Sequence, residues 1–212
     1  VDTFELAPQA SFGVLMESQG VSYQDASAIY AASKEVYDLA SIRAGKKISL
    51  FYDHSSDTLK GLMYPLSPDE ELHVRKHTDG WKAELETIHY EIKVKKIKGK
   101  VASSLYAAAL EQGMDERAVI ELGDVFQWTI DFAQDVRVGD TFSVVYEERY
   151  RDGAYAMPGA VLVAEYVNAG EAHRAYLFKN AAGEEGYYDE KGVALRKMFL
   201  KAPVAFKYIT SG

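Results

Sequence analysis

The sequence predicts an α+β protein of two domains, in which short helix pairs are combined with mostly antiparallel sheets. Two patterns indicate this class. Apolar residues recur at helical spacing in two pairs of short segments, and alternating segments bounded by turn residues follow each pair. The two helix pairs also resemble each other in sequence, which predicts a duplicated helix–helix–strand unit. A chain of 212 residues is long enough for two small domains.

The first helix pair is marked by its predicted caps. Ser11 is a plausible N-cap of one helix, and Gly20 is a natural stop for it. Ser22 begins a second helix with Asp25 three residues later, which is a variant capping box. The apolar stripes of the two helices consist of Phe12, Leu15, Met16, Ala26, Ile29 and Tyr30.

The same order of signals returns in the second half of the chain. Ser104 precedes a helical pattern that ends at Gly113, and Asp115 caps another helix. In each half the turn that leads into the next strand contains a glycine, Gly45 or Gly139. We therefore expect residues 11–52 and 104–146 to be two copies of one unit, with the two glycines in equivalent turns.

Predicted strands follow each helix pair. The first half has a strand over residues 59–65 and a hairpin around Thr78-Asp79-Gly80. A long strand over residues 89–101 is expected to bridge the halves. The second half continues with strands at residues 160–168, 173–179 and 187–188.

Charge and composition exclude several classes of function. The net charge is −8, and an acidic chain is a poor non-specific binder of nucleic acid because phosphate affinity comes from clustered cations. The basic run over residues 93–100 alternates with apolar residues, as the solvated face of a strand does. No segment approaches the roughly 20 apolar residues that span a bilayer. The chain has no cysteine, so thiolate chemistry and disulfides are excluded. Its start at Val1 lacks the features of a signal peptide, so any signal or anchor is expected upstream or already removed.

No catalytic constellation is evident in the sequence. His73 and His77 have the i, i+4 spacing of a helical zinc pair, but their segment alternates like a strand, which would place them roughly 13 Å apart. Asp131, Asp135 and Asp140 are interpreted as turn caps with an ion pair to Arg137. Aromatic residues leave two alternatives open. Trp81, Tyr187 and Tyr188 can stack on sugar rings or pack on a sheet face, whereas Trp128 is predicted to lie in the core.

The C-terminal segment carries a family resemblance. Tyr187-Tyr188, Gly192, Leu195-Arg196-Lys197, Phe199-Leu200 and Pro203-Val204 stand in the order Tyr-Tyr…Gly-x-x-Leu-Arg-Lys-x-Phe-Leu…Pro-Val. This order resembles the lead-in to the catalytic domain of the lysostaphin-like (LytM) zinc endopeptidases of Gram-negative periplasms. Residues 128–142 are similar to a segment of the domain just upstream in that family. Residues 1–95 resemble a LysM or opacity-protein module more weakly, without the typical LysM opening and its asparagine.

The resemblance implies a domain plan and a location. Residues 1–95 would be a LysM-like regulatory domain, residues 96–206 a second α+β domain, and residues 207–212 the start of the catalytic domain. The zinc ligands of the family would follow Gly212, so zinc is implied for the parent enzyme and no metal or catalytic residue for this chain. The implied location is the periplasm, with anchoring to the inner membrane by an upstream segment as an open alternative. The candidates for glycan or domain-interface contacts are Trp81, Tyr187, Tyr188, Arg196 and Phe199.

Two functional hypotheses follow from the resemblance. In the first, the chain is a regulatory and positioning region of a zinc metalloendopeptidase that cleaves peptidoglycan cross-links, and it inhibits its own catalytic domain. Its partners are then that domain and peptidoglycan. In the second, the chain is a glycan-binding module without an inhibitory role, which would require an aromatic-lined furrow on the helix pairs.

Overall fold

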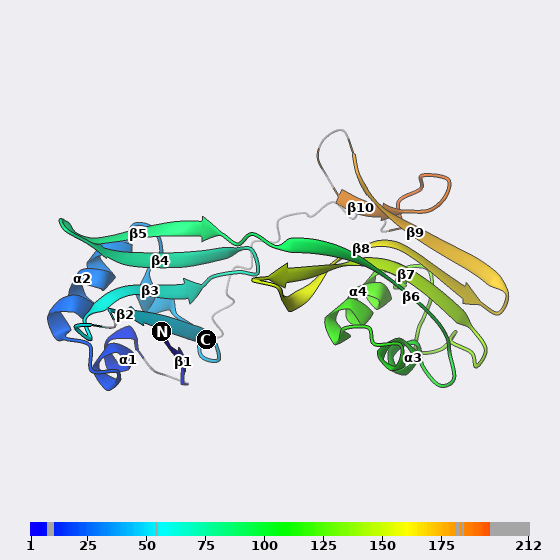
Figure 1. Ribbon diagram of the computed structural model, residues 1–212. Helices are drawn as coiled ribbons and strands as arrows, with labels where there is room; N and C mark the ends of the chain where they lie inside the picture. Colours follow the sequence, from blue (N-terminus) through cyan, green and yellow to red (C-terminus); the bar gives the residue numbers. More distant parts are fainter. Residues whose placement is uncertain (8–10, 54, 181–182, 184, 196–212) are drawn as a thin grey trace, which may run out of the picture. The chain divides into compact units, whose positions relative to one another are not determined.

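The computed structural model describes residues 1–7, 11–53, 55–180, 183 and 185–195 (Figure 1). The chain divides into two compact units, Val1–His89 and a second unit that begins at Tyr90. The sequence predicted a domain boundary between residues 95 and 96. The two compact units separate earlier, between His89 and Tyr90, because one strand of the second sheet runs from Glu91 to Lys100. The predicted α+β class with antiparallel sheets is confirmed. Among the described residues, no helix has both the length and the apolar character needed to cross a bilayer.

The first unit is a five-stranded antiparallel meander with two helices inserted after its first strand. In order, its elements are β1 (Asp2–Glu5), α1 (Phe12–Ser18), α2 (Tyr23–Ser33), a short 3-10 helix (Leu39–Ser41), β2 (Lys47–Tyr52), β3 (Leu59–Pro65), β4 (Glu70–His77) and β5 (Gly80–Thr87). Each strand pairs with the next one along the chain.

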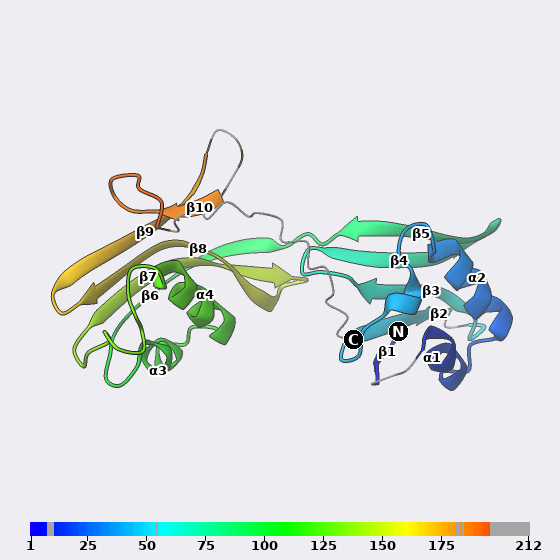
Figure 2. The ribbon, with the colours of Figure 1, turned by 180° about the vertical axis from the view of Figure 1, so that it is seen from behind.

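Apart from the 3-10 helix, the described part of the second unit has the same order of elements and the same sheet topology. Its elements are β6 (Glu91–Lys100), α3 (Leu105–Glu111), α4 (Glu116–Phe126), β7 (Thr141–Arg151), β8 (Ala154–Asn168), β9 (Glu171–Lys179) and β10 (Glu185–Tyr188). The helices α3 and α4 lie on one face of this sheet, as the views from the two sides show (Figures 1 and 2).

The helix caps predicted from the sequence are confirmed. The side chains of Ser11, Ser22, Ser104 and Asp115 each accept a hydrogen bond from a backbone N–H in the first turn of their helix. Such side-chain oxygens satisfy N–H groups that have no partner within the helix. The four short helices therefore begin where the sequence placed them.

The turns before β2 and β7 are also equivalent. The Gly45 N–H donates to the Leu6 carbonyl at 2.9 Å, and the Gly139 N–H donates to the Val101 carbonyl at 2.9 Å. Both glycines have positive φ, 78° and 103°, which a side chain would disfavour. In return, the N–H groups of Leu6 and Val101 donate to the carbonyls of Lys46 and Asp140. We call this pair of hydrogen bonds the turn clasp. Its presence in both units confirms the predicted repeat.

Each unit has its own apolar core between the helix pair and one sheet face. In the first core, Met16, Ile29, Leu39, Ile48 and Leu50 are fully buried. In the second, Phe126, Val144 and Ala164 are fully buried. The opposite face of the second sheet has no covering helix within the described part of the chain.

The prediction that Trp128 is a core residue was wrong. The helix α4 ends at Phe126, which takes the buried position, and the chain then turns so that Ile130 takes the next one. Trp128 falls between them and is 56% exposed. Helical spacing therefore cannot be extended past Gln127, the C-cap.

Asp140 joins three parts of the second unit. It is 5% exposed. Its carboxylate accepts hydrogen bonds from the backbone N–H groups of Arg137 and Ala169 and from the side chains of Tyr166 and Asn168. Turn capping is thus confirmed, but the bond from Arg137 comes from its backbone N–H, not from the guanidinium that an ion pair would use. Burial alone would raise the pKa of Asp140, and these hydrogen bonds to the ionised form lower it from 3.8 to about 2.

We expect Asp140→Ala to lower the free energy of unfolding by about 3 kcal/mol, because the buried Tyr166 hydroxyl and three part-buried donors lose a charged acceptor. Urea denaturation of the 212-residue chain measures this loss. Glu111→Ala, at an exposed helix end, is the matched control and should change stability by less than about 0.5 kcal/mol. Equal, small effects of the two substitutions would contradict the structural role of Asp140.

The same carboxylate predicts an acid-sensitive contribution to stability. Its folded pKa of about 2 lies below the ordinary value of 3.8, so the stabilisation is complete above about pH 4 and is lost as the pH falls toward 2. The loss should amount to about 2 kcal/mol. Unfolding measured from pH 6 to pH 2 should show this component in the natural chain and lack it in Asp140→Asn. If the pH dependence of unfolding were the same in Asp140→Asn as in the natural chain, the acid sensitivity would come from other groups.

Candidate binding surfaces

The two histidines at zinc-like spacing lie on a strand, as predicted. His73 and His77 are both in β4, and His73 Nε2 lies 3.2 Å from a carboxylate oxygen of Glu71. The described residues contain no group of three or more His, Cys, Asp or Glu side chains arranged to hold a metal ion. In an extended strand, His73 and His77 would be roughly 13 Å apart, too far to share one zinc ion. These residues do not fit zinc, so no chemical step is assigned to them.

A groove of about 760 Å³ runs along the helix pair of the first unit. Phe12, Tyr23 and Tyr30 supply its aromatic lining, and Tyr23 is 89% exposed. Gly13 and Ser27 leave space along its length, since a Cβ atom at Gly13 would meet no other atom within 4 Å. This is the aromatic-lined furrow that glycan binding by a helix pair requires.

The second unit has a smaller groove, of about 250 Å³, at the equivalent place. The pairs of equivalent lining residues are Ser11 and Ser104, Phe12 and Leu105, Gly13 and Tyr106, Ala26 and Val119, Ser27 and Ile120, and Tyr30 and Gly123. Tyr106 takes the place of a glycine, and its hydroxyl donates to Glu116 at 2.5 Å, from α3 to α4. The larger side chains of Tyr106, Val119 and Ile120 therefore fill part of the second groove, although Leu105 and Gly123 are smaller than Phe12 and Tyr30 in the first.

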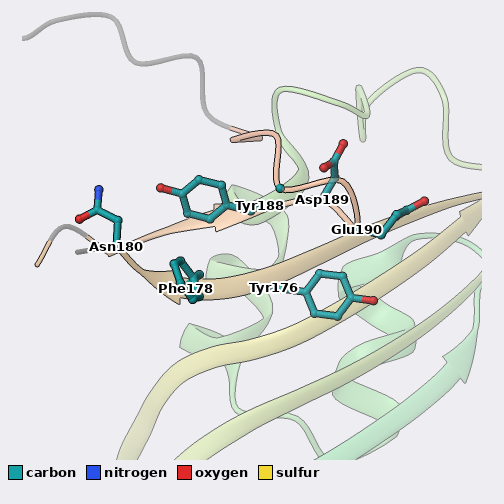
Figure 3. A pocket seen from close by; sticks show the side chains of 7 residues that line it. Tyr176, Phe178, Asn180, Tyr188, Asp189 and Glu190 are labelled. Atoms are coloured by element: carbon teal, nitrogen blue, oxygen red, sulfur yellow. The ribbon is translucent and has the colours of Figure 1, made fainter. Parts of the chain in front are cut away.

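A third hollow lies at the outer strands of the second sheet (Figure 3). Tyr176, Phe178 and Tyr188 form its aromatic part, and Asn180, Asp189 and Glu190 supply polar atoms around it. We call it the β9–β10 pocket; its volume is about 480 Å³. The rings of Phe178 and Tyr188 meet edge to face, with centroids 6.0 Å apart. Aromatic rings in a hollow with polar groups at its rim are typical of ligand-binding surfaces.

The structure gives the predicted site residues different roles. Tyr188 lines the β9–β10 pocket, but the neighbouring Tyr187 points into the core and its hydroxyl donates to Glu121 at 2.9 Å. Burial and the Glu121 carboxylate raise the pKa of Tyr187. Trp81 belongs to the first unit, where it packs against the core with the Lys76 ammonium 5.2 Å above its ring. Arg196 and Phe199 lie outside the described residues, as do residues 207–212.

Sequence reasoning missed Tyr176 and Phe178. The signal was present in the alternation of β9, where Ala175 is fully buried and its neighbours on either side must face outward. Phe178 is an apolar residue on that outward face, and it is 60% exposed. An aromatic residue at a predicted outward position is thus the pattern that identifies this pocket.

Comparison with known proteins places this architecture. The chain is 27% identical to the peptidoglycan DD-endopeptidase ShyC of Vibrio cholerae over 210 residues, which cover 99% of this chain and 48% of ShyC. It is 23% identical to the peptidoglycan DD-endopeptidase ShyA of the same organism, over 97% of this chain and 47% of ShyA. The chain spans about half the length of the curated relatives it matches. These features define it as homologous to the non-catalytic N-terminal region of LytM-type peptidoglycan endopeptidases.

The sequence signature of the Csd3 second domain matches residues 89–212, and the chain belongs to that family. The matched region begins one residue before the second unit. Solved structures show the same fold. A zinc-containing peptidase from Vibrio cholerae superposes with a TM-score of 0.68 and 19% identity, over 93% of this chain and 59% of the other. Helicobacter pylori Csd3 superposes with a TM-score of 0.66 and 19% identity, over 89% of this chain and 50% of Csd3.

The comparison of the two grooves predicts the result of a graft. We expect Gly13→Tyr, which copies Tyr106, to fold with a free energy of unfolding unchanged or raised by about 0.5 kcal/mol, because tyrosine is a better helix former than glycine. Gly99→Ala is the contrasting variant, since its Cβ would lie 2.6 Å from the Phe142 ring. It should lose about 1 kcal/mol or more. Urea denaturation of both variants makes the comparison, and a destabilised Gly13→Tyr would show that the first groove is not open.

Proposed function

We propose that the chain is the regulatory and positioning region of a periplasmic zinc metalloendopeptidase that cleaves peptidoglycan cross-links. The observation that carries the proposal is the match along 99% of this chain to about half of a peptidoglycan DD-endopeptidase. The zinc-dependent chemistry would belong to the other part of such an enzyme. This chain would contribute contacts to that part and to peptidoglycan.

The proposed regulation is inhibition by the first unit. A wall hydrolase that is always open would endanger the cell, and a docked domain can cover a catalytic groove. Contacts between domains resemble transient protein interfaces, so a closed and an open state would differ by only a few kcal/mol. The first unit suits such a role because it has its own core and does not need the second unit to bury its apolar residues.

Deletion of residues 1–89 from the full-length enzyme should raise its rate on purified peptidoglycan. This boundary keeps β6 whole, whereas a deletion of residues 1–95 would remove half of an edge strand of the second sheet. The control is the melting curve of the truncated enzyme, which confirms that the remaining part is folded. An unchanged rate in a folded truncated enzyme would remove the inhibitory role.

A second candidate function is peptidoglycan binding by the first unit, and the groove between α1 and α2 favours it. The exposed ring of Tyr23 and the half-buried ring of Tyr30 offer apolar faces to sugar rings, while Ser11, Ser27 and Glu17 add polar groups to the lining. Because the second groove is partly filled, only the first unit would bind peptidoglycan at its helix pair.

Gly13→Tyr and Tyr23→Ala should each weaken binding of the chain to purified sacculi if this second function is correct. The first fills the groove without strain and the second removes its most exposed ring. A loss of about 1.4 kcal/mol would appear as tenfold weaker binding in a co-sedimentation titration. Trp128→Ala, which removes an exposed ring elsewhere, is the control. Equal binding by all of these variants would exclude the groove as a glycan site.

A further inference from the structure

The face of the second sheet opposite α3 and α4, which no described helix covers, carries an ordered row of side chains. The strand register pairs Lys96 with Val145, Val145 with Val163, Val163 with Tyr176, and Tyr176 with Tyr188. The row therefore crosses all five strands, from β6 to β10. The adjacent residues Ile97, Val144, Ala164 and Ala175 are buried on the other face, beneath α3 and α4. Alternation along each strand places the row on the face that these helices leave free.

The chemistry of the row changes from one end to the other. At β9 and β10 it ends in the β9–β10 pocket, where the exposed ring of Phe178 joins the exposed Tyr176 and the half-buried Tyr188 (Figure 3). Val145 and Val163 form an apolar middle. At β6 it begins with Lys96, and the next outward positions along the same strand are Lys98 and Lys100, all exposed.

The three lysines stand out because the chain is acidic. Its net charge is −8, and among the described residues Lys96, Lys98 and Lys100 have no ion-pair partner, whereas Lys93 and Lys95 pair with Glu91 and Glu148. Outward neighbours on a strand are roughly 7 Å apart, so these ammonium groups form a line of positive charge. This line lies about 14 Å from the aromatic rings of β9, at about 4.8 Å per strand.

We propose that this face binds a peptidoglycan strand, with a sugar ring against Tyr176, Phe178 and Tyr188 and the carboxylates of the attached peptide toward Lys96, Lys98 and Lys100. A pyranose ring presents C–H bonds to the electron-rich face of an aromatic ring, and its hydroxyl groups donate hydrogen bonds to Asn180, Asp189 or Glu190. The peptide stem carries free carboxylates, which complement the lysines and are repelled by the acids at the pocket. The charge pattern therefore also sets the direction of the ligand across the strands.

This inference rests on the proposed function for the nature of the ligand, but it concerns a different surface from the groove of the first unit. Exposed aromatic clusters on soluble domains generally mark interaction sites. Lysines on an edge strand alone would be explained as protection against strand pairing. Protection against strand pairing does not explain why Lys96 stands in one row across the sheet with the residues of the aromatic pocket.

The test uses the 212-residue chain with two probes: purified sacculi, and the soluble disaccharide tetrapeptide obtained from them. The double variant Tyr176→Ala, Phe178→Ala should bind both probes about tenfold more weakly, and Lys96→Gln, Lys98→Gln should flatten the salt dependence of binding. Trp128→Ala should bind like the natural chain. Far-ultraviolet circular dichroism and melting curves of each variant establish that the fold is retained.

Unchanged binding of sacculi and of the soluble fragment by a folded aromatic double variant would overturn the inference. So would a variant that binds normally but alters the rate of the full-length enzyme, because the face would then contact another protein domain. Failure of the inference is distinguishable from failure of the proposed function. Deletion of residues 1–89 leaves this face intact, so a rate unchanged by the deletion alongside lost binding in the aromatic variant would support the inference alone.

Discussion

The turn clasp is the interaction on which the rest of each unit depends. It fastens the chain before the helix pair to the turn after it, through Leu6 with Gly45 and Lys46 in the first unit and Val101 with Gly139 and Asp140 in the second. The clasp thereby holds together the two ends of the segment that contains the helix pair. The apolar residues of both helices must then face the same side of the sheet. A helix pair can cover only one face of a five-stranded meander, so the clasp also determines which face remains free.

The two clasps are reinforced differently, and the difference shows how the copies have diverged. In the first unit, the Arg43 N–H donates directly to the hydroxyl of the buried Tyr64. In the second, the Asp140 carboxylate stands between the Arg137 N–H and the hydroxyl of Tyr166. The helix surfaces differ as well, because the groove along the helix pair is open in the first unit and partly filled in the second. Each unit therefore offers one distinctive surface, the helix groove in the first and the uncovered sheet face in the second.

Much of this fold could be predicted from sequence because its determinants are local. Caps such as Ser22 and Asp115 and the stop at Gly113 act on their own helix, and alternation along β4 and β9 is a property of the strand itself. Three features were missed, for different reasons. Trp128 was misplaced because the end of α4, not its spacing, decides which side chain is buried. The β9–β10 pocket depends on register across separate strands, and the four residues of β1 are too few to show a pattern.

In the proposed function, this chain engages peptidoglycan and its own enzyme without cutting the wall itself. The most direct measurement incubates the purified 212-residue chain with sacculi and analyses pellet and supernatant separately. The chain is expected to sediment with the sacculi, and no soluble muropeptides should appear, with or without added zinc. Release of muropeptides by the chain alone would contradict this proposal.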